Sequence, residues 1–229
     1  ASASGSRTRL GNGTDYQKEK FLKPLFNGEK RICYSMTEKA AGADATGMQT
    51  RAEKDGKGNY VLNGEKWYSS SANVADIAVV MAKTNPEAPR HQQFSTFIVE
   101  LPNPGYRIIR NIPTMAIHKD YQEAMGAAHC EIALENLVVP EENLLGGEGQ
   151  GFAMGQHRLA YGRLRHGMHN VAMAQRALDL ATAPVTQRST FGKGLAERQG
   201  GQFMLDDSAR QRSIARRMPM HIQYKAENG

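Results

Sequence analysis

The chain has 229 residues, 40% hydrophobic and 23% charged, which is an ordinary composition for a soluble globular protein of one large domain or two small ones. No apolar run approaches the roughly 18 residues that a membrane span needs, and residues 1–6 lack the apolar stretch of a secretory signal, so we expect a disordered lead-in there. Two cysteines, Cys33 and Cys130, lack CxxC spacing; they exclude a disulfide framework and a zinc ribbon, and they indicate a reducing compartment.

The formal net charge of +6 is unevenly distributed along the chain. Residues 1–156 hold 17 basic and 18 acidic side chains, whereas residues 157–229 hold 12 and 5, and 10 of those 12 basic residues are arginines. Guanidinium groups suit phosphate because their donors form a planar fork. Three interpretations stay open for this basic third: a solvated helix face or subunit interface, a site for a phosphorylated cofactor, or a nucleic-acid surface.

The first predicted element is an amphipathic helix over residues 15–26, capped by Thr14 or Asp15 and closed by Asn27-Gly28. From residue 31 to about 137, short apolar runs alternate with turn residues. They predict strands at 59–62, 65–68, 77–82, 95–101, 106–109 and 129–134, with turns at 55–56, 85–86 and 102–105. Asn63-Gly64 is a type I′ hairpin signal between the first two of these strands. The spacing is typical of an antiparallel sandwich or barrel.

A glycine-rich segment, 146–151, ends the β region. It matches neither GxGxxG nor the P-loop pattern, so we expect a flexible hinge. Beyond it the apolar period becomes 3.6, which predicts one long helix and then a second over 201–224. Pro184 and Pro219 fall inside these patterns and are expected to end or kink their helices. The predicted fold class is therefore α+β, with an antiparallel β-sandwich or barrel followed by long helices.

Two groups of residues suit a ligand. Cys33–Glu38, Gly42–Asp44 and Lys66–Ser71 place hydroxyls and small residues at strand ends beside Trp67, where they could contact a flat polar ring, although a lone tryptophan also fits a core. The turn 187–199 combines a guanidinium with a helix start, which suits pyrophosphate and fits a plain interhelix loop equally well.

Neither a metal site nor a nucleophilic dyad is expected. His166 and His169 lie three apart on a predicted helix without a third ligand, so we interpret them as surface histidines. No nucleophile has a base nearby in the sequence.

These segments, in this order, resemble the acyl-CoA dehydrogenase family. The family's aromatic-x-x-Thr-Glu-Pro and Gly-Ser-Asp signature corresponds to Tyr34–Lys39 and Gly42–Asp44, and its Asn-Gly-x-Lys-Trp segment to Asn63–Trp67. The Arg-x-x-Phe-Gly-Lys turn corresponds to Arg188–Lys193, and the Gly-Thr-x-x-Gln-Lys lead to Gly13–Lys18. Trp67–Ser70 and Gly162–His166 point to the branch whose animal members are larger multidomain proteins.

The resemblance implies a helical N-terminal domain, a middle β-domain and a C-terminal helical bundle, with FAD between the last two. Residues 1–30 would be a lead-in and short helix, 31–148 the β-domain, and 149–229 an incomplete helical bundle. By resemblance, the FAD-binding residues are Tyr34, Met36, Thr37, Gly42, Trp67, Ser69, Arg188, Phe191, Arg198 and Gln199. Of these, Ser69 would bond near flavin N5, and Arg188, Phe191 and Gln199 would reach the pyrophosphate and adenosine of a neighbouring subunit's FAD. Ala43 and Arg163 would lie at the acyl-CoA.

The family's reaction removes an α-proton from an acyl-CoA while a β-hydride passes to the flavin, and it needs a carboxylate base. One family position for this base is Gly162, where glycine cannot serve, and the other would lie beyond residue 229, so no catalytic base is named. Lys39 replaces the signature proline and Ala43 replaces a serine that contacts the substrate.

The expected function is FAD-dependent α,β-dehydrogenation of an acyl-CoA by a homodimer or homotetramer in fatty acid β-oxidation, with electron-transfer flavoprotein as an implied partner. Localisation would be cytoplasmic in a bacterium, and mitochondrial or peroxisomal in a eukaryote. One alternative is a catalytically incomplete fragment that only binds flavin or oligomerises. A weaker alternative is a nucleic-acid-binding module on Arg210, Arg212, Arg216 and Arg217, which lack the interleaved aromatics that stack on bases. No metal, nucleic acid or membrane is expected as a partner.

Overall fold

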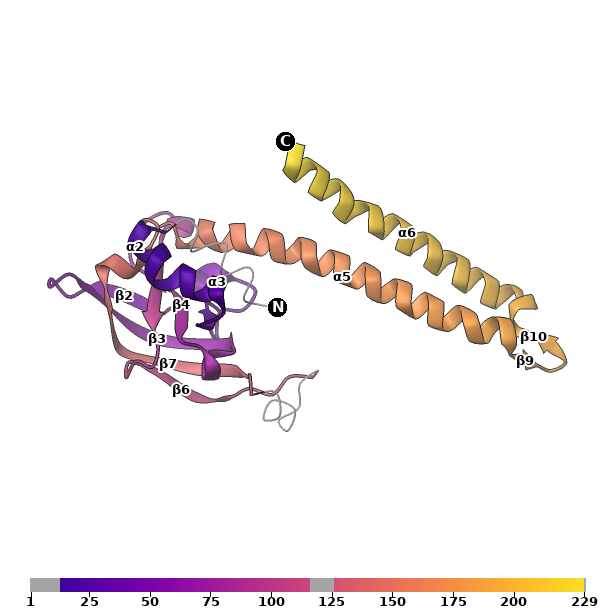
Figure 1. The fold of residues 1–229 in the computed structure, drawn as a ribbon, viewed down its shortest axis with the longest axis horizontal. Coiled ribbons are helices and arrows are strands. Elements are labelled where there is room, and N and C mark those ends of the chain that lie inside the picture. Colours follow the sequence, from indigo (N-terminus) through magenta and orange to yellow (C-terminus); the bar gives the residue numbers. More distant parts are fainter. Residues whose placement is uncertain (1–12, 116–125, 229) are drawn as a thin grey trace. The chain divides into compact units, whose positions relative to one another are not determined.

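The computed structural model describes residues 13–115 and 126–228, apart from the side chains of residues 226 and 227. The expected lead-in at residues 1–6 lies outside this range. The chain forms two compact units, residues 1–158 and 159–229, and the division falls inside the long helix α5 (Gly151–Gln187). Figure 1 shows a sheet with short helices in the first unit and the long helices that make up most of the second.

The N-terminal helical segment follows the prediction. It comprises α2 (Asp15–Gln17), the π-helical turn η1 (Lys18–Leu22) and α3 (Lys23–Asn27). Thr14 forms a capping box with Gln17, and Gly28 ends the segment with a φ of 78°. The side-chain amide of Gln17 also donates, through Nε2, to the carbonyls of Glu142 and Leu144, at 2.7 and 2.9 Å. These bonds connect the helix to the end of the sheet.

The first unit is built on a sheet of eight strands, of which seven follow the order β6-β7-β3-β2-β4-β5-β8 and the eighth, β1, pairs with β4. The strands are β1 (Ile32–Ser35), β2 (Arg51–Lys54), β3 (Asn59–Ser70), β4 (Ile77–Lys83), β5 (Phe94–Glu100), β6 (Tyr106–Asn111), β7 (His129–Pro140) and β8 (Leu144–Leu145). Short 3₁₀ turns lie at η2 (Ala45–Gly47), η3 (Ala72–Val74), η4 (Arg90–Gln92) and η5 (Glu141–Asn143).

Most strand pairs are antiparallel, as predicted, but β1 runs parallel to β4, with Ile32 opposite Ile77. A single bridge between β2 and β4 is also parallel. Strand β4 is buried along Ile77–Ala82 because β1, β2 and β5 pair with it and both of its faces are covered. Its continuous apolar run is the pattern of a strand that is buried on both faces.

The predicted hairpin at Asn63-Gly64 is wrong, because β3 runs through both residues as one strand. A Cβ on Gly64 would lie 2.6 Å from Thr50 Oγ1, so glycine is needed here for close approach of β2 and not for a turn. Asn63 accepts a hydrogen bond from the Asn136 amide at 2.8 Å, at a register shift between β3 and β7. The true β2–β3 turn lies at 55–58, where Asp55 accepts from the Lys57 amide.

Residues 146–151 form a packed turn and not the expected flexible hinge. A Cβ on Gly149 would lie 2.7 Å from the Gln92 carbonyl oxygen, and one on Gly151 would lie 2.8 Å from the Phe94 carbonyl oxygen. The Gly149 amide donates to Ser95 Oγ at 3.0 Å. The glycines therefore let this segment lie against the backbone at the start of β5 before α5 begins.

The second unit consists of α5 from residue 159, the two-stranded β9 (Ser189–Thr190) and β10 (Lys193–Gly194), the turn η6 (Leu195–Glu197) and α6 (Gln199–Asn228). Each proline lies inside its helix and does not end it at that residue, and the expected alternative of a kink stays a prediction. Pro184 lies three residues before the end of α5, so its missing N–H removes one helical hydrogen bond in the last turn. Pro219 lies beside Gly167 of α5, where a Cβ would lie 3.5 Å from the proline Cγ, an ordinary contact distance.

Among the described side chains of residues 159–228, none is buried. Large apolar side chains on both helices stay more than half exposed, among them Met168, Phe203, Met204, Ile214 and Tyr224. Within the described residues, no helix has the length and apolar character needed to cross a membrane.

Candidate functional site

A buried ion pair holds the loop that follows β1. Lys66 Nζ of β3 lies 2.8 Å from Glu38 Oε1, and both side chains are almost completely buried. The ammonium also donates to the Met36 carbonyl at 3.1 Å. The Glu38 carboxylate accepts from the amides of Gln49 and Thr50, at 2.5 and 3.0 Å, so one pair fixes both ends of the loop 36–50.

Both members of the pair carry charge at neutral pH. Burial by itself would raise the pKa of Glu38, but the Lys66 ammonium and the Gln49 amide outweigh this effect and hold that pKa below its ordinary value. Burial lowers the pKa of Lys66 to about 8, because the attraction of Glu38 offsets only part of the desolvation. Glu38 therefore stabilises the loop, and its negative charge is paired with the Lys66 ammonium.

Trp67 lies against the same loop. Its amide donates to the Thr37 carbonyl at 2.7 Å, and its half-buried indole has the Lys39 ammonium at 5.1 Å and the Arg110 guanidinium at 5.2 Å from the ring centroid. These are cation–π distances. The half-buried Thr37 hydroxyl has no hydrogen-bond partner among the described residues. Lys39, at the position of the signature proline, thus contacts the tryptophan.

The end of β3 decides which side chains reach the surface. The register with β7 shifts between Lys66 and Ser69, and Tyr68 adopts a left-handed backbone with a φ of 55°, which is rare for an aromatic residue. Tyr68 is 46% exposed, Ser69 is completely buried, and Ser70 is half-buried. The expectation that Ser69 Oγ faces a flavin therefore does not fit this geometry, and Ser70 is the hydroxyl beside the exposed Tyr68.

Ser69 instead belongs to a buried polar network. Its hydroxyl lies 2.9 Å from Ser35 Oγ, which lies 2.8 Å from the Tyr106 hydroxyl, and Cys33 Sγ lies 3.7 Å from the same hydroxyl. Burial raises the pKa of Tyr106 well above its ordinary value and that of Cys33 to about 11, so both stay protonated. Cys33 and Cys130 are buried free thiols.

Replacing Tyr106 with phenylalanine is expected to lower the free energy of unfolding by about 1–3 kcal/mol, because the buried Ser35 hydroxyl loses a partner and cannot reach water. Urea unfolding followed by far-ultraviolet circular dichroism measures this change. The matched control is Tyr16→Phe, which removes a hydroxyl from a side chain that is 39% exposed. Equal midpoints for the two variants would contradict the importance of the network.

The signature residues Gly42 and Ala43 lie on an exposed part of the loop, and a Cβ on Gly42 would meet nothing within 4 Å. Asp44 caps η2 through the Thr46 amide at 3.1 Å and pairs with Arg90 at 2.9 Å. The Thr46 hydroxyl, with Arg90 as a lesser cause, lowers the pKa of Asp44. This carboxylate therefore stabilises the loop.

Four of the residues predicted to bind FAD lie together in the second unit, on the connection between α5 and α6, and three of them, Arg188, Phe191 and Gln199, are those expected at the pyrophosphate and adenosine. Phe191 is 99% exposed, and both Phe191 and Gly192 adopt positive φ, as a two-residue type I′ turn requires. Arg198 donates to the Thr190 carbonyl and lies 6.0 Å from the Phe191 ring centroid. Arg188 and Gln199, at the two ends of the connection, are exposed.

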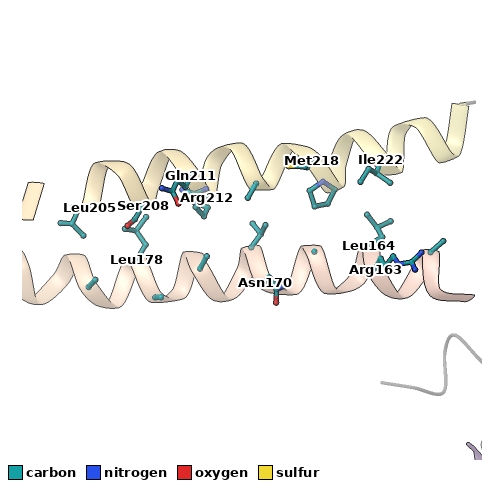
Figure 2. Close-up of a pocket in the computed structure, with 18 residues that line it drawn as sticks. Arg163, Leu164, Asn170, Leu178, Leu205, Ser208, Gln211, Arg212, Met218 and Ile222 are labelled. Atoms are coloured by element: carbon teal, nitrogen blue, oxygen red, sulfur yellow. The ribbon is translucent and has the colours of Figure 1, made fainter. Parts of the chain in front are cut away.

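An apolar groove of about 1100 Å³ lies between α5 and α6 (Figure 2). Leu164, Leu178 and Leu205 project into it, and Arg163 and Arg212 add guanidinium groups. Gly162 precedes Arg163 on α5, and a Cβ there would meet nothing within 4 Å. Of the arginines considered for nucleic acid, Arg210 pairs with Asp206 and Asp207 on its own helix.

Tyr68 and Ser70 belong to the candidate segment Lys66–Ser71, but the sequence did not predict their partner at the exposed end of β3, which is His129. Ser70 Oγ lies 2.8 Å from His129 Nδ1 of β7, and the Tyr68 and His129 rings meet edge to face at 6.2 Å. No sequence signal joins residues 59 positions apart; only the β3–β7 pairing places Ser70 opposite His129. Among the described residues, no group of three or more histidine, cysteine or acidic side chains could hold a metal ion.

Comparisons with known proteins agree on one family. The family model described as "Acyl-CoA dehydrogenase, middle domain" matches residues 33–137, and "Acyl-CoA dehydrogenase, C-terminal domain" matches residues 149–229. "Probable acyl-CoA dehydrogenase FadE2" of Mycobacterium tuberculosis is 44% identical over 190 residues, which are 81% of this chain and 44% of that protein. "Acyl-CoA dehydrogenase family member 11" of Gallus gallus is 40% identical over 80% of this chain and 23% of its own length. The chain thus spans less than half the length of these relatives.

Solved structures share the fold. The butyryl-CoA dehydrogenase of Megasphaera elsdenii aligns with a TM-score of 0.81 at 34% identity, over 96% of this chain and 55% of that one. The FAD complex of PigA aligns with a TM-score of 0.86 at 25% identity, over 98% of this chain and 57% of that one.

Proposed function

Because this chain belongs to the acyl-CoA dehydrogenase family, we propose that it binds FAD and takes part in the α,β-dehydrogenation of an acyl-CoA thioester. The observation that carries the proposal is the group at the end of β3, where an exposed and strained Tyr68 stands beside the Ser70 hydroxyl and the loop held by Lys66 and Glu38. Residues with a strained backbone conformation such as that of Tyr68 are found most often at ligand and active sites.

The residues of the first unit fit a flavin ring system. Tyr68 and Trp67 offer aromatic surface, Ser70 and Thr37 offer hydroxyls, and the buried ion pair holds both ends of the loop 36–50. An apolar wall with a few fixed polar groups is the usual composition of a cofactor site. When bound, FAD supplies the acceptor for the hydride.

The residues of the interhelical connection fit the rest of the cofactor. Arg188 and Arg198 supply guanidinium groups, Phe191 supplies an exposed ring, and Gln199 lies at the start of α6. Guanidinium groups and a helix start are both suited to a pyrophosphate. In the family this connection reaches the FAD of a neighbouring subunit, which supports a homodimer or homotetramer.

Acyl-CoA handling is proposed for Arg163 and the loop around Ala43. Alanine at position 43 offers no hydroxyl to a substrate, and glycine at 162 cannot accept the α-proton. Electron-transfer flavoprotein is proposed as the partner that takes electrons away.

A second candidate function is flavin binding or oligomerisation without dehydrogenation. Gly162 favours it, and so do the exposed apolar side chains of α5 and α6, because patches of this kind mark interfaces between proteins. A protein that retains FAD and self-associates, but whose flavin is not reduced by any acyl-CoA, would favour this candidate.

The proposal is tested by titrating the purified 229-residue protein with FAD and following the quenching of flavin fluorescence. Tyr68→Ala is expected to weaken FAD affinity roughly tenfold to a hundredfold, because an aromatic wall is lost together with its stacking contact. The matched control is Phe26→Ala, which removes an aromatic ring that is 64% exposed on α3 and is expected to leave affinity unchanged. Failure of the parent protein to bind FAD would refute the proposed function.

A further inference from the structure

The pair formed by Ser70 and His129 can make hydrogen bonds in two arrangements. Ser70 Oγ lies 2.8 Å from His129 Nδ1 and 3.4 Å from the Tyr68 carbonyl oxygen. If Nδ1 carries the hydrogen, the ring donates to Ser70, whose own proton is then directed to the Tyr68 carbonyl. If Nδ1 is bare, Ser70 donates to the ring and the bond to Tyr68 is lost. The first arrangement makes two hydrogen bonds and the second makes one.

His129 is well held for the first arrangement. Its carbonyl accepts from the Ile112 amide at 2.7 Å, its Cα is the cross-strand partner of Ser70, and its ring meets the Tyr68 ring edge to face. The imidazole is half-buried, so its second nitrogen can exchange with solvent. The Ser70–Tyr68 bond lies at the long end of the hydrogen-bond range and is the weakest contact in the group.

We propose that His129 is a positioning residue that donates from Nδ1 to Ser70 and thereby releases the Ser70 proton toward a ligand on Tyr68. The inference rests on the proposed function, in which that ligand is the flavin ring. Oxidised flavin offers an acceptor nitrogen at N5, and this nitrogen carries a hydrogen once the flavin is reduced. Ser70, as an outward donor, therefore favours the oxidised form.

Two variants separate the nitrogen of His129 from its ring. His129→Phe keeps an aromatic ring against Tyr68 but has no donor, whereas His129→Asn keeps an N–H donor near the position of Nδ1 but has no ring. We expect His129→Phe and Ser70→Ala each to weaken binding of oxidised FAD roughly tenfold, the size of one hydrogen bond. The affinity of His129→Asn for oxidised FAD should stay within about twofold of that of the parent. The double variant His129→Phe/Ser70→Ala should bind oxidised FAD as weakly as either single variant.

The midpoint potential gives a readout that a purely structural role would not move. Because affinity for the reduced flavin should change little, a tenfold loss for the oxidised form raises the potential of the bound two-electron couple by about 30 mV. The control is His91→Ala, which removes an imidazole stacked on Phe152 at 4.6 Å in the same unit and should leave the potential unchanged.

A measurement without flavin keeps the two proposals distinguishable. Nitrogen-15 spectra of histidine-labelled protein should show hydrogen on Nδ1 of His129, and Ser70→Ala should shift that signal. A bare Nδ1 that does not respond to Ser70→Ala overturns the inference whether or not FAD binds. The inference is also overturned if the parent binds FAD and His129→Phe binds it with the same affinity, or if His129→Asn binds FAD as weakly as His129→Phe. Absence of FAD binding by the parent refutes the proposed function instead, and the inference with it.

Discussion

Replacing Lys66 with methionine is expected to lower the free energy of unfolding by about 3–5 kcal/mol, because it leaves the Glu38 carboxylate buried without its counter-ion. Glu38 would keep its bonds to the amides of Gln49 and Thr50, but these cannot replace the ammonium at 2.8 Å. The loop 36–50 should then loosen and FAD affinity should fall with stability. Urea unfolding at pH 7 measures the first effect and FAD titration the second.

The Lys66–Glu38 pair also makes the stability of the folded protein depend on pH in the acid range. The folded pKa of Glu38 lies below its ordinary value of 4.5, so its stabilising contribution is complete above pH 4.5 and is lost as the pH falls through the lowered folded pKa. Lys66→Met/Glu38→Gln should recover most of the lost stability and remove this part of the acid dependence, because neither side chain is then charged. The control Lys23→Met breaks an exposed pair with Glu19 and should leave stability essentially unchanged. A double variant no more stable than Lys66→Met would contradict the account.

Replacing Gly162 with glutamate is expected to speed reduction of the bound flavin by acyl-CoA about 10²–10⁴-fold, the usual contribution of a positioned general base. This prediction rests on our proposal, from the resemblance of residues 162–166 to the family, that position 162 is one of the family's two base positions. A side chain fits there, since a Cβ would meet nothing within 4 Å, and the helix gains a better helix former. Anaerobic mixing with acyl-CoAs of several lengths, followed through the oxidised flavin band, measures the rate.

The matched control is Gly162→Gln, which has the same size but no basic carboxylate. It should react at the rate of the parent protein. Equal rates for the glutamate and glutamine variants would refute the assignment of position 162, and so would fast bleaching by the parent.

Much of the fold could be read from local pattern. Thr14 and Gly28 delimit the first helix because capping depends on a few adjacent residues. The apolar runs located the residues of β3 to β7 but not the short strands β1, β2 and β8, and the change of period located the two long helices. The family signatures added the expectation of FAD, because they record a site that no single run of residues reveals.

The site was less predictable because it depends on pairing between distant strands. Ser69 and Ser70 are chemically identical neighbours. Only the register shift against β7, with Tyr68 at a positive φ, buries Ser69 and leaves Ser70 partly exposed. His129 joins Ser70 for the same reason. The turn predicted at Gly64 is wrong because this glycine instead allows the close approach of Thr50, a contact with a residue 14 positions earlier that no local pattern shows.

By itself, then, the sequence determined where the helices and most of the longer strands lie, the α+β class and the family, since these follow from periodicity, capping and residue signatures along the chain. Only the tertiary structure decided that β1 runs parallel to β4, that Lys66 forms a buried ion pair with Glu38, and that Ser70 is partly exposed whereas Ser69 is buried. The physical reason is that strand register and burial are set by packing across the whole sheet, where a shift of one residue reverses the face of every side chain.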